Sequence, residues 1–250
     1  MTLQFSGKKE RIEPHREFYG RVIDQMPLLV SGKDKEGKVV DVPRVPVSFA
    51  YVLERRMNAP EDVRETWQDN NIFTGDGVAR GVDGDVVCTW DNPLLRTLTP
   101  ESTLGNHSSL KLFPDQWNEL RAQEGALYLS AEQVAEAQFK GYVKKGGVWQ
   151  PENTIVGNVW EHLTRGRDLK SYAEMVADAK PHSGRIMTVY LDQSQLSSPN
   201  LRAWVANRVD FNSNANGNSN LSNDNGRLVG VAPEAHVALK KMLKHKFKQL

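Results

Sequence analysis

The sequence predicts an α+β fold, with β-hairpins of a mixed sheet in the N-terminal part and a helix-rich C-terminal part. Three observations support this class. The tight-turn pair Asp83-Gly84 joins two apolar segments, a capping box begins at Ser130, and apolar residues across 155–163 follow helical spacing. Because helices and strands mix without strict alternation, an α+β fold is favoured over an alternating α/β fold.

The first expected elements are two strands, at 28–31 and 38–42, joined by the polar loop 32–37. The segment 42–47 follows and contains two prolines. Proline cannot donate a hydrogen bond to a neighbouring strand, so this segment is expected to be extended and at a sheet edge.

Two short helices are expected next. Ser48 can cap the first one. Its apolar face would be formed by Phe49, Val52, Leu53 and Met57. Pro60 can begin the second helix, since proline is tolerated in the first turn, and Val63 and Trp67 would be its buried pair.

The clearest hairpin joins strands at 78–82 and 86–90. A helix at 114–123 and a strand at 126–129 follow. Ser130, with Gln133 three residues later, then begins a helix that ends near residue 141.

A break at Lys144-Lys145-Gly146-Gly147 suggests a boundary between a strand-rich part, 1–146, and a helix-rich part, 147–250, although one continuous domain fits equally well. The elements expected beyond this break are helices at 155–163 and 169–176, a strand buried on both faces at 186–191, a helix from Ser198 with Leu201, Trp204 and Val205 inward, a strand at 228–231, and a terminal helix at 233–250.

The composition is that of an ordinary globular protein. The 250 residues include 39% hydrophobic residues and 32 basic against 31 acidic side chains, for a net charge of +1. This balance excludes a collagen-like, disulfide-scaffold or fully disordered chain. The one cysteine, Cys88, permits no intramolecular disulfide, and no signal peptide or spanning segment is visible. We therefore expect a soluble cytoplasmic protein.

The tract 212–225 is dominated by asparagine. It contains seven Asn and three Ser among 14 residues. Such a composition cannot bury a core, so an exposed polar loop is expected. Asp224 is its only carboxylate, which argues against a calcium loop and favours a connector or a loop that orders on a partner.

No catalytic or cofactor motif is decisive. Phosphate-loop, hydrolase-elbow and zinc-spacing motifs are missing, so the sequence assigns no metal and leaves the cofactor unknown. Asp192 follows the expected buried strand, a position where α/β enzymes often place chemistry, with His182 and Glu161 as further catalytic candidates. The alternative is that Asp192 only begins a turn.

Aromatic and basic residues alternate between residues 139 and 149. Tyr142 and Trp149 are candidate stacking groups for bases, and Lys144 and Lys145 candidate phosphate contacts. The alternative is a Gly-Gly turn with buried rings and solvated lysines.

Further basic residues lie between and on the later helices. Arg165, Arg167 and Lys170 would suit a helix–turn–helix reader or a plain helical hairpin. The terminal helix carries Lys240, Lys241 and Lys244 within a segment of net charge +4, which leaves −3 for residues 1–232. It could contact nucleic acid or an acidic protein, or pack on the protein's own body.

Three functions therefore stay open. The first is nucleic-acid association through this local basic and aromatic surface. The second is a small-molecule enzyme with a site near Asp192, and the third is a non-catalytic assembly or interaction protein. The sequence does not indicate the oligomeric state.

Overall fold

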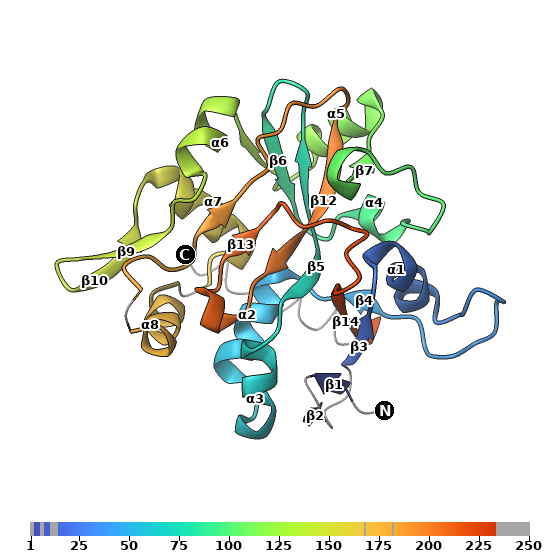
Figure 1. Cartoon of the computed structure of the whole chain (residues 1–250), viewed down its shortest axis with the longest axis horizontal. Coiled ribbons are helices and arrows are strands. Elements are labelled where there is room, and N and C mark those ends of the chain that lie inside the picture. The colour runs from blue at the N-terminus through green and yellow to red at the C-terminus, as the bar shows by residue number, and fades with distance from the viewer. Residues whose placement is uncertain (1–2, 6–7, 11–14, 168, 182, 234–250) are drawn as a thin grey trace.

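Nine consecutive buried residues form the longest strand, β5 (Ile72–Arg80), near the centre of a ten-stranded sheet (Figure 1). The computed structural model describes residues 3–5, 8–10, 15–167, 169–181 and 183–233. Strand β5 lies between β12 (Asn200–Ala206), which is antiparallel to it, and β14 (Arg227–Val231), which pairs with it in parallel. Burial on both faces explains why these central strands show little alternation of polar and apolar residues.

The remaining strands extend this sheet or form separate hairpins. Those in the sheet are β3 (Arg16–Tyr19), β4 (Val45–Pro46), β6 (Val86–Thr89), β7 (Leu110–Lys111), β8 (Leu127–Leu129), β11 (Val189–Tyr190) and β13 (Ala215–Asn216). The hairpins are β1 (Leu3–Phe5) with β2 (Lys8–Glu10), and β9 (Tyr142–Lys145) with β10 (Val148–Pro151).

Helices cover both faces of the sheet. The α-helices are α1 (Val22–Ser31), α2 (Phe49–Asn58), α3 (Glu61–Gln68), α4 (Pro93–Arg96), α5 (Pro114–Ala122), α6 (Ala131–Ala137), α7 (Thr154–Thr164) and α8 (Leu169–Ala179). Two short 3-10 helices are η1 (Asn106–Ser108) and η2 (Val209–Phe211). This combination of helices with a mixed sheet confirms the α+β class.

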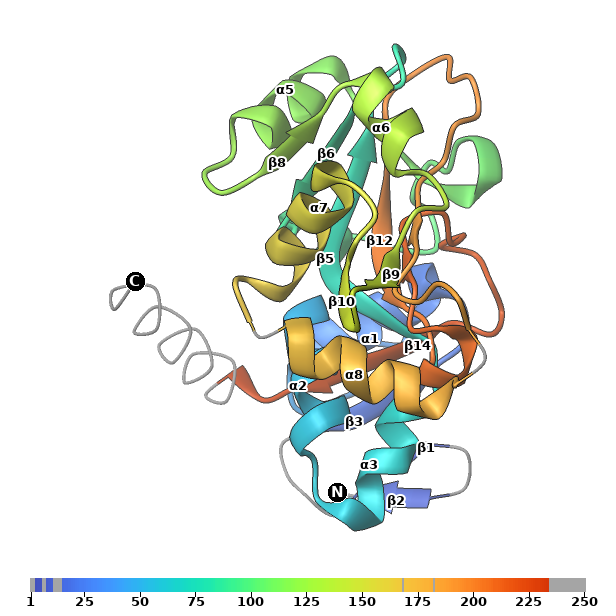
Figure 2. The ribbon, with the colours of Figure 1, turned by 90° about the vertical axis from the view of Figure 1, so that its left-hand side faces the viewer.

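The sheet separates two hydrophobic cores. One core lies beneath α2, α3, α6, α7 and α8 and includes Trp67, Trp160 and Trp204. The other lies beneath α1, α4 and α5 and includes Phe73 and Leu221. Figures 1 and 2 show α6, α7 and α8 together on one side of the molecule, away from α1 and α4.

Several local predictions are confirmed. Ser48 caps α2 by accepting a hydrogen bond from the Tyr51 amide, and Val63 and Trp67 are buried on α3. The 82–85 turn joins β5 to β6, and Ser130 and Gln133 form the capping box of α6. The helix at 114–123, the strands at 126–129 and 228–231 and the extended 42–47 segment are also present, as α5, β8, β14 and β4.

The strand expected at 28–31 is wrong. This segment is the second half of α1, which contains Pro27 in its interior. The helix forms despite this proline because its apolar face is buried in the core beneath α1, α4 and α5. The buried residues are Val22, Ile23, Met26 and Leu29. Within the described 32–42 loop, β-structure is limited to a single bridge between Lys33 and Val39, in place of the strand expected at 38–42.

The helix expected from Ser198 is also wrong, since β12 occupies 200–206. Leu201 and Val205 face the core beneath α1, whereas Trp204 faces the opposite core. Of the strand expected at 186–191, only Val189 and Tyr190 pair as β11, although most of the segment is buried.

Strands from both sides of residue 146 share the sheet. Strand β5 pairs with β12 and β14, and residue 146 lies in the turn of the β9–β10 hairpin. Helices occur on both sides of this position in the chain. The terminal helix expected at 233–250 lies, except for its first residue, outside the described residues. None of the described helices is long and apolar enough to cross a membrane.

Candidate functional site

Asp192 lies in an ion-pair cluster with arginines from the two central strands. Its Oδ2 accepts a hydrogen bond from Arg202 at 2.9 Å, and its Oδ1 lies 3.5 Å from Nη1 of Arg80. Burial alone would raise the pKa of Asp192, but hydrogen bonds from Ser194 and the two guanidinium charges lower it. A carboxylate held ionised in this way is poorly suited to proton transfer near neutral pH. The geometry favours the turn alternative, and a catalytic role for Asp192 stays a prediction.

The two other catalytic candidates do not join Asp192. Glu161 is exposed on α7, whereas the ion-pair cluster of Asp192 among the described residues is formed by Arg80 and Arg202. Glu161 and burial together raise the pKa of the nearby Tyr142, burial being the larger cause, to about 12. His182 lies outside the described residues.

Arg165 is buried rather than presented to a ligand. It ends α7 in the left-handed conformation, and its Nη2 donates to Oδ1 of Asp76 at 3.0 Å. Asp76 is fully buried and also accepts hydrogen bonds from the Phe49 and Asp91 amides, at 2.7 and 2.9 Å. The guanidinium of Arg165 lies over the Trp90 ring. These contacts hold α7 to the sheet, so this arginine is not placed to contact DNA.

Arg167 is also held by the fold, because it donates to the Ala50 carbonyl at 2.8 Å. Lys170 is exposed on α8. The structure therefore does not gather Arg165, Arg167 and Lys170 into one basic surface. Lys240, Lys241 and Lys244 lie outside the described residues.

The β9–β10 hairpin exposes its lysines but not its candidate stacking residues. Lys144 and Lys145 are exposed, and the hairpin extends away from the body (Figure 1). Tyr142 is buried against Trp160, and Trp149 is half-buried against the core. These two aromatic rings are therefore not open faces for base stacking.

The first third of the Asn/Ser tract corrects the expectation of an exposed loop. Ser213, Asn214 and Ala215 are buried. The Asn214 side chain accepts a hydrogen bond from the Thr188 amide and donates to the Phe211 carbonyl, both at 3.0 Å. Buried polar residues are tolerated here because they are hydrogen-bonded to the backbone of neighbouring segments.

The rest of the tract is fixed at three points. A Cβ on Gly217 would lie 3.1 Å from both Trp204 and Val78, and one on Gly226 would lie 2.5 Å from a backbone carbonyl oxygen. Between these glycines, Leu221 is fully buried in the core beneath α1. Its amide donates to the Ser108 carbonyl at 3.0 Å. Close backbone approach and one buried side chain thus hold this segment on the body.

Between Gly217 and Gly226, five polar side chains are exposed, although one of them, Asn218, accepts a hydrogen bond from Arg202, and the half-buried Ser222 donates one to Ser108. We call residues 218–225 the polar segment. Its exposed residues are Asn218, Asn220, Asn223, Asp224 and Asn225. Tyr19, with 55% of its surface exposed, donates its hydroxyl to Oδ1 of Asn225 at 2.9 Å and places an aromatic ring beside the segment.

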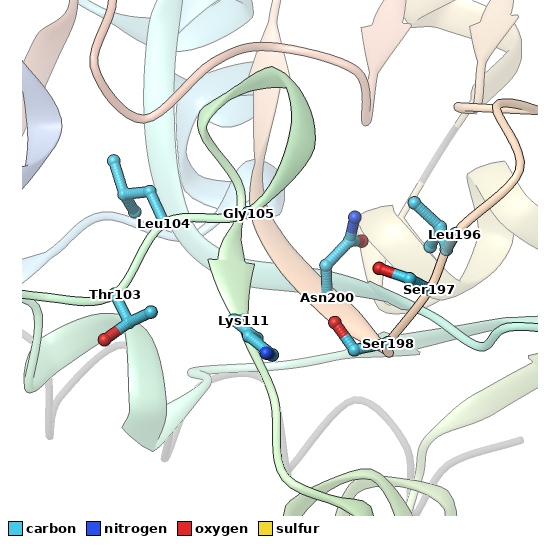
Figure 3. Close-up of a pocket in the computed structure, with 8 residues that line it drawn as sticks. All are labelled: Thr103, Leu104, Gly105, Lys111, Leu196, Ser197, Ser198 and Asn200. Atoms are coloured by element: carbon cyan, nitrogen blue, oxygen red, sulfur yellow. The ribbon is translucent and has the colours of Figure 1, made fainter.

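A pocket of about 210 Å³ lies at the beginning of β12, beside its first residue, Asn200 (Figure 3). It is lined by Thr103, Leu104, Gly105, Lys111, Leu196, Ser197, Ser198 and Asn200. Sequence reasoning missed this pocket, because its residues come from three separate segments and form no motif. The pairing of Asn200 with Lys111 across β12 and β7 is what brings them together.

No group of three or more His, Cys, Asp or Glu side chains suited to a metal ion occurs among the described residues. Comparison with protein-family models and with curated proteins gives no match. The structure is similar to a solved structure described as "Accommodation of massive sequence variation in Nanoarchaeota by the C-type lectin fold". The match has a TM-score of 0.59 and 13% sequence identity, and covers 89% of this chain and 99% of the other. At this identity the similarity shows the fold alone.

Proposed function

We propose that this protein is a non-catalytic interaction protein that binds another protein through the polar segment 218–225. The observation that carries the proposal is that this segment combines a fixed backbone with exposed side chains. Leu221 and the two flanking glycines fix its backbone, whereas five polar side chains between them remain exposed. A fixed backbone with exposed side chains loses little conformational entropy on binding.

The chemistry of the segment suits a protein partner. Asn and Ser side chains offer both donors and acceptors, and Tyr19 adds a rigid aromatic ring at the edge. The same residue types are enriched in antibody binding loops, where Tyr supplies contact area and Ser and Asn supply adaptable hydrogen bonds. The tract contains no Lys or Arg and one Asp, which disfavours a phosphate backbone as its ligand.

The structural comparison adds support of a different kind. In the similar structure, the C-type lectin fold is described as accommodating massive sequence variation. For this chain we propose a related property: the exposed positions of the polar segment serve recognition and are not needed for folding.

Site-specific photocrosslinking tests this function. A photoreactive amino acid replaces Asn220 in the polar segment or, as a matched control, the exposed Glu119 on α5. After irradiation of cells that make the protein, we expect a defined protein adduct from position 220 that is missing from position 119. Identical adducts from both positions, or none from position 220, would contradict the proposal.

Nucleic-acid association is the second candidate function, and among the described residues the β9–β10 hairpin supports it best. The exposed Lys144 and Lys145 favour it, because both lie beside a projecting turn. Binding to single- and double-stranded oligonucleotides should weaken as salt rises. Changing both lysines to Ala should reduce that salt dependence, whereas changing the exposed Lys33 and Lys35 to Ala should not. Failure to bind at low salt would reject this candidate.

A further inference from the structure

A row of polar side chains crosses three strands beside the pocket. Asn200 on β12 pairs with Lys111 on β7 and with Arg80 on β5. Residues directly opposite each other in antiparallel strands project from the same face of the sheet. An amide therefore lies between two cations on one face, and the amide and Lys111 both line the pocket.

The pocket lining is rich in hydrogen-bond donors. Figure 3 shows the Asn200 amide and the Ser197 hydroxyl pointing toward one another, with the Ser198 hydroxyl beside them. Lys111 lies between Thr103 and Ser198 in the same view. The eight lining residues include no carboxylate, so the lining offers one positive charge and no negative charge.

The surroundings add further positive charge. Arg80 and Arg202 share the single carboxylate of Asp192, and Arg202 also donates to the side-chain carbonyl of Asn218. Both arginines are more than nine-tenths buried, and within the described part of the chain neither Nε has a hydrogen-bond acceptor. Burial lowers the pKa of both guanidinium groups, which means that their charge is poorly solvated and would be stabilised by a nearby anion.

From this arrangement we propose that the pocket binds a phosphate-type oxyanion, with Lys111 supplying charge and Ser197, Ser198 and Asn200 supplying hydrogen bonds. A volume of about 210 Å³ accommodates a small anion or the phosphoryl end of a larger molecule. Oxyanions are bound by hydrogen-bond donors together with a cationic side chain, and this pocket wall offers both. The eight lining residues lie outside the polar segment, and Arg202, beside the pocket, contacts that segment through Asn218. The proposed function and this inference are tested with different variants and probes, so they can fail independently.

Titration calorimetry at constant ionic strength tests the proposal, with inorganic phosphate and O-phosphoserine as probes and chloride as the control anion. Saturable binding of either phosphate compound is expected, with NMR shifts concentrated at residues 103–111 and 196–200. Binding of inorganic phosphate indicates a free-anion site. Binding of O-phosphoserine alone indicates a phosphomonoester site, and both results support the proposal.

Two variants with the same change in charge distinguish a specific phosphate site from nonspecific electrostatic attraction to the protein. Lys111→Gln should weaken phosphate binding about tenfold, since it removes one charge-assisted hydrogen bond. Lys35→Gln makes the same charge change at an exposed position in the 32–42 loop and should change affinity less than about twofold. Ser198→Ala provides a second test without a charge change. Equal effects of the two lysine variants, or no saturable binding of either phosphate compound, would overturn the proposal.

Discussion

Arg56 is fully buried, and all five of its N–H groups donate hydrogen bonds. The acceptors come from four regions of the chain. They are the carbonyls of Trp67, Asn70 and Ala206 and the hydroxyls of Tyr172 and Ser213. One side chain thus ties α2 to α3, α8, β12 and the beginning of the Asn/Ser tract.

Replacing this residue should be costly. Arg56→Met leaves several buried acceptors without a donor, so we expect the free energy of unfolding to fall by about 3–5 kcal/mol. Arg64→Met removes one hydrogen bond, to the Ala59 carbonyl, and should cost about 1 kcal/mol. Urea unfolding followed by circular dichroism measures both values. Similar costs for the two variants would refute the role assigned to Arg56.

Glu17 makes the folded state more stable at acidic pH than at neutral pH. Burial, only partly opposed by Arg227, raises the pKa of Glu17 from 4.5 to about 7. The folded state therefore keeps a proton that the unfolded state releases. The contribution of Glu17 to stability is full below pH 4.5 and is lost as pH rises toward about 7.

His162 has the opposite effect over an overlapping pH range. Burial and, to a smaller extent, Arg165 lower its pKa from 6.5 to about 4, so its contribution is lost as pH falls through that range. In Glu17→Gln the His162 effect should remain, and the free energy of unfolding should rise from pH 4.5 to 6.5 more steeply than in the unsubstituted protein. Denaturant unfolding at a series of pH values measures this slope. Parallel profiles for the two proteins would show that Glu17 does not titrate as described.

Local signals predicted most of the helices correctly, because caps and turns act over a few residues. Ser48, Ser130 and the Asp83-Gly84 turn are examples. Where tertiary packing decides, sequence reasoning failed. Leu201, Trp204 and Val205 fit helical spacing, yet on β12 they face two different cores.

The candidate site was predictable only in part. The composition of the tract identified its polar character, but burial of its first third depends on partners such as Thr188 that are distant in sequence. The pairing of Arg165 with Asp76 was not predictable for the same reason, since the two residues lie 89 positions apart in the chain. The sequence does not reveal which charges the fold will pair.

Within the polar segment, the buried residue should contribute to stability, whereas the exposed residues should not. Leu221→Ala empties a buried position and should lower the free energy of unfolding by about 2–4 kcal/mol. Asn220→Ala, at the adjacent exposed position, should change it by less than about 0.5 kcal/mol. Urea unfolding of the two variants provides the comparison. A large loss of stability in Asn220→Ala would mean that the exposed side chains support the fold.

The shared sheet predicts cooperative unfolding of the whole molecule. Because β5 pairs with β12 and β14, the parts before and after residue 146 should unfold together. Cys88 on β6 reports this event, since burial raises the pKa of its thiol to about 12 and keeps it unreactive in the folded state. Thiol labelling and circular dichroism should give the same urea midpoint. A lower midpoint for labelling would reveal separate unfolding of the N-terminal part.

At the scale of the whole molecule, a sheet between two hydrophobic cores holds the polar segment on its surface. We propose that the exposed side chains of this segment bind a protein partner. The most direct test uses a variant with Asn220→Ala and Asp224→Ala together and measures how much of the partner crosslinked from position 220 the purified variant retains. We predict loss of partner binding with an unchanged melting temperature. Retention of the partner at the unsubstituted level by a folded variant would contradict the claim.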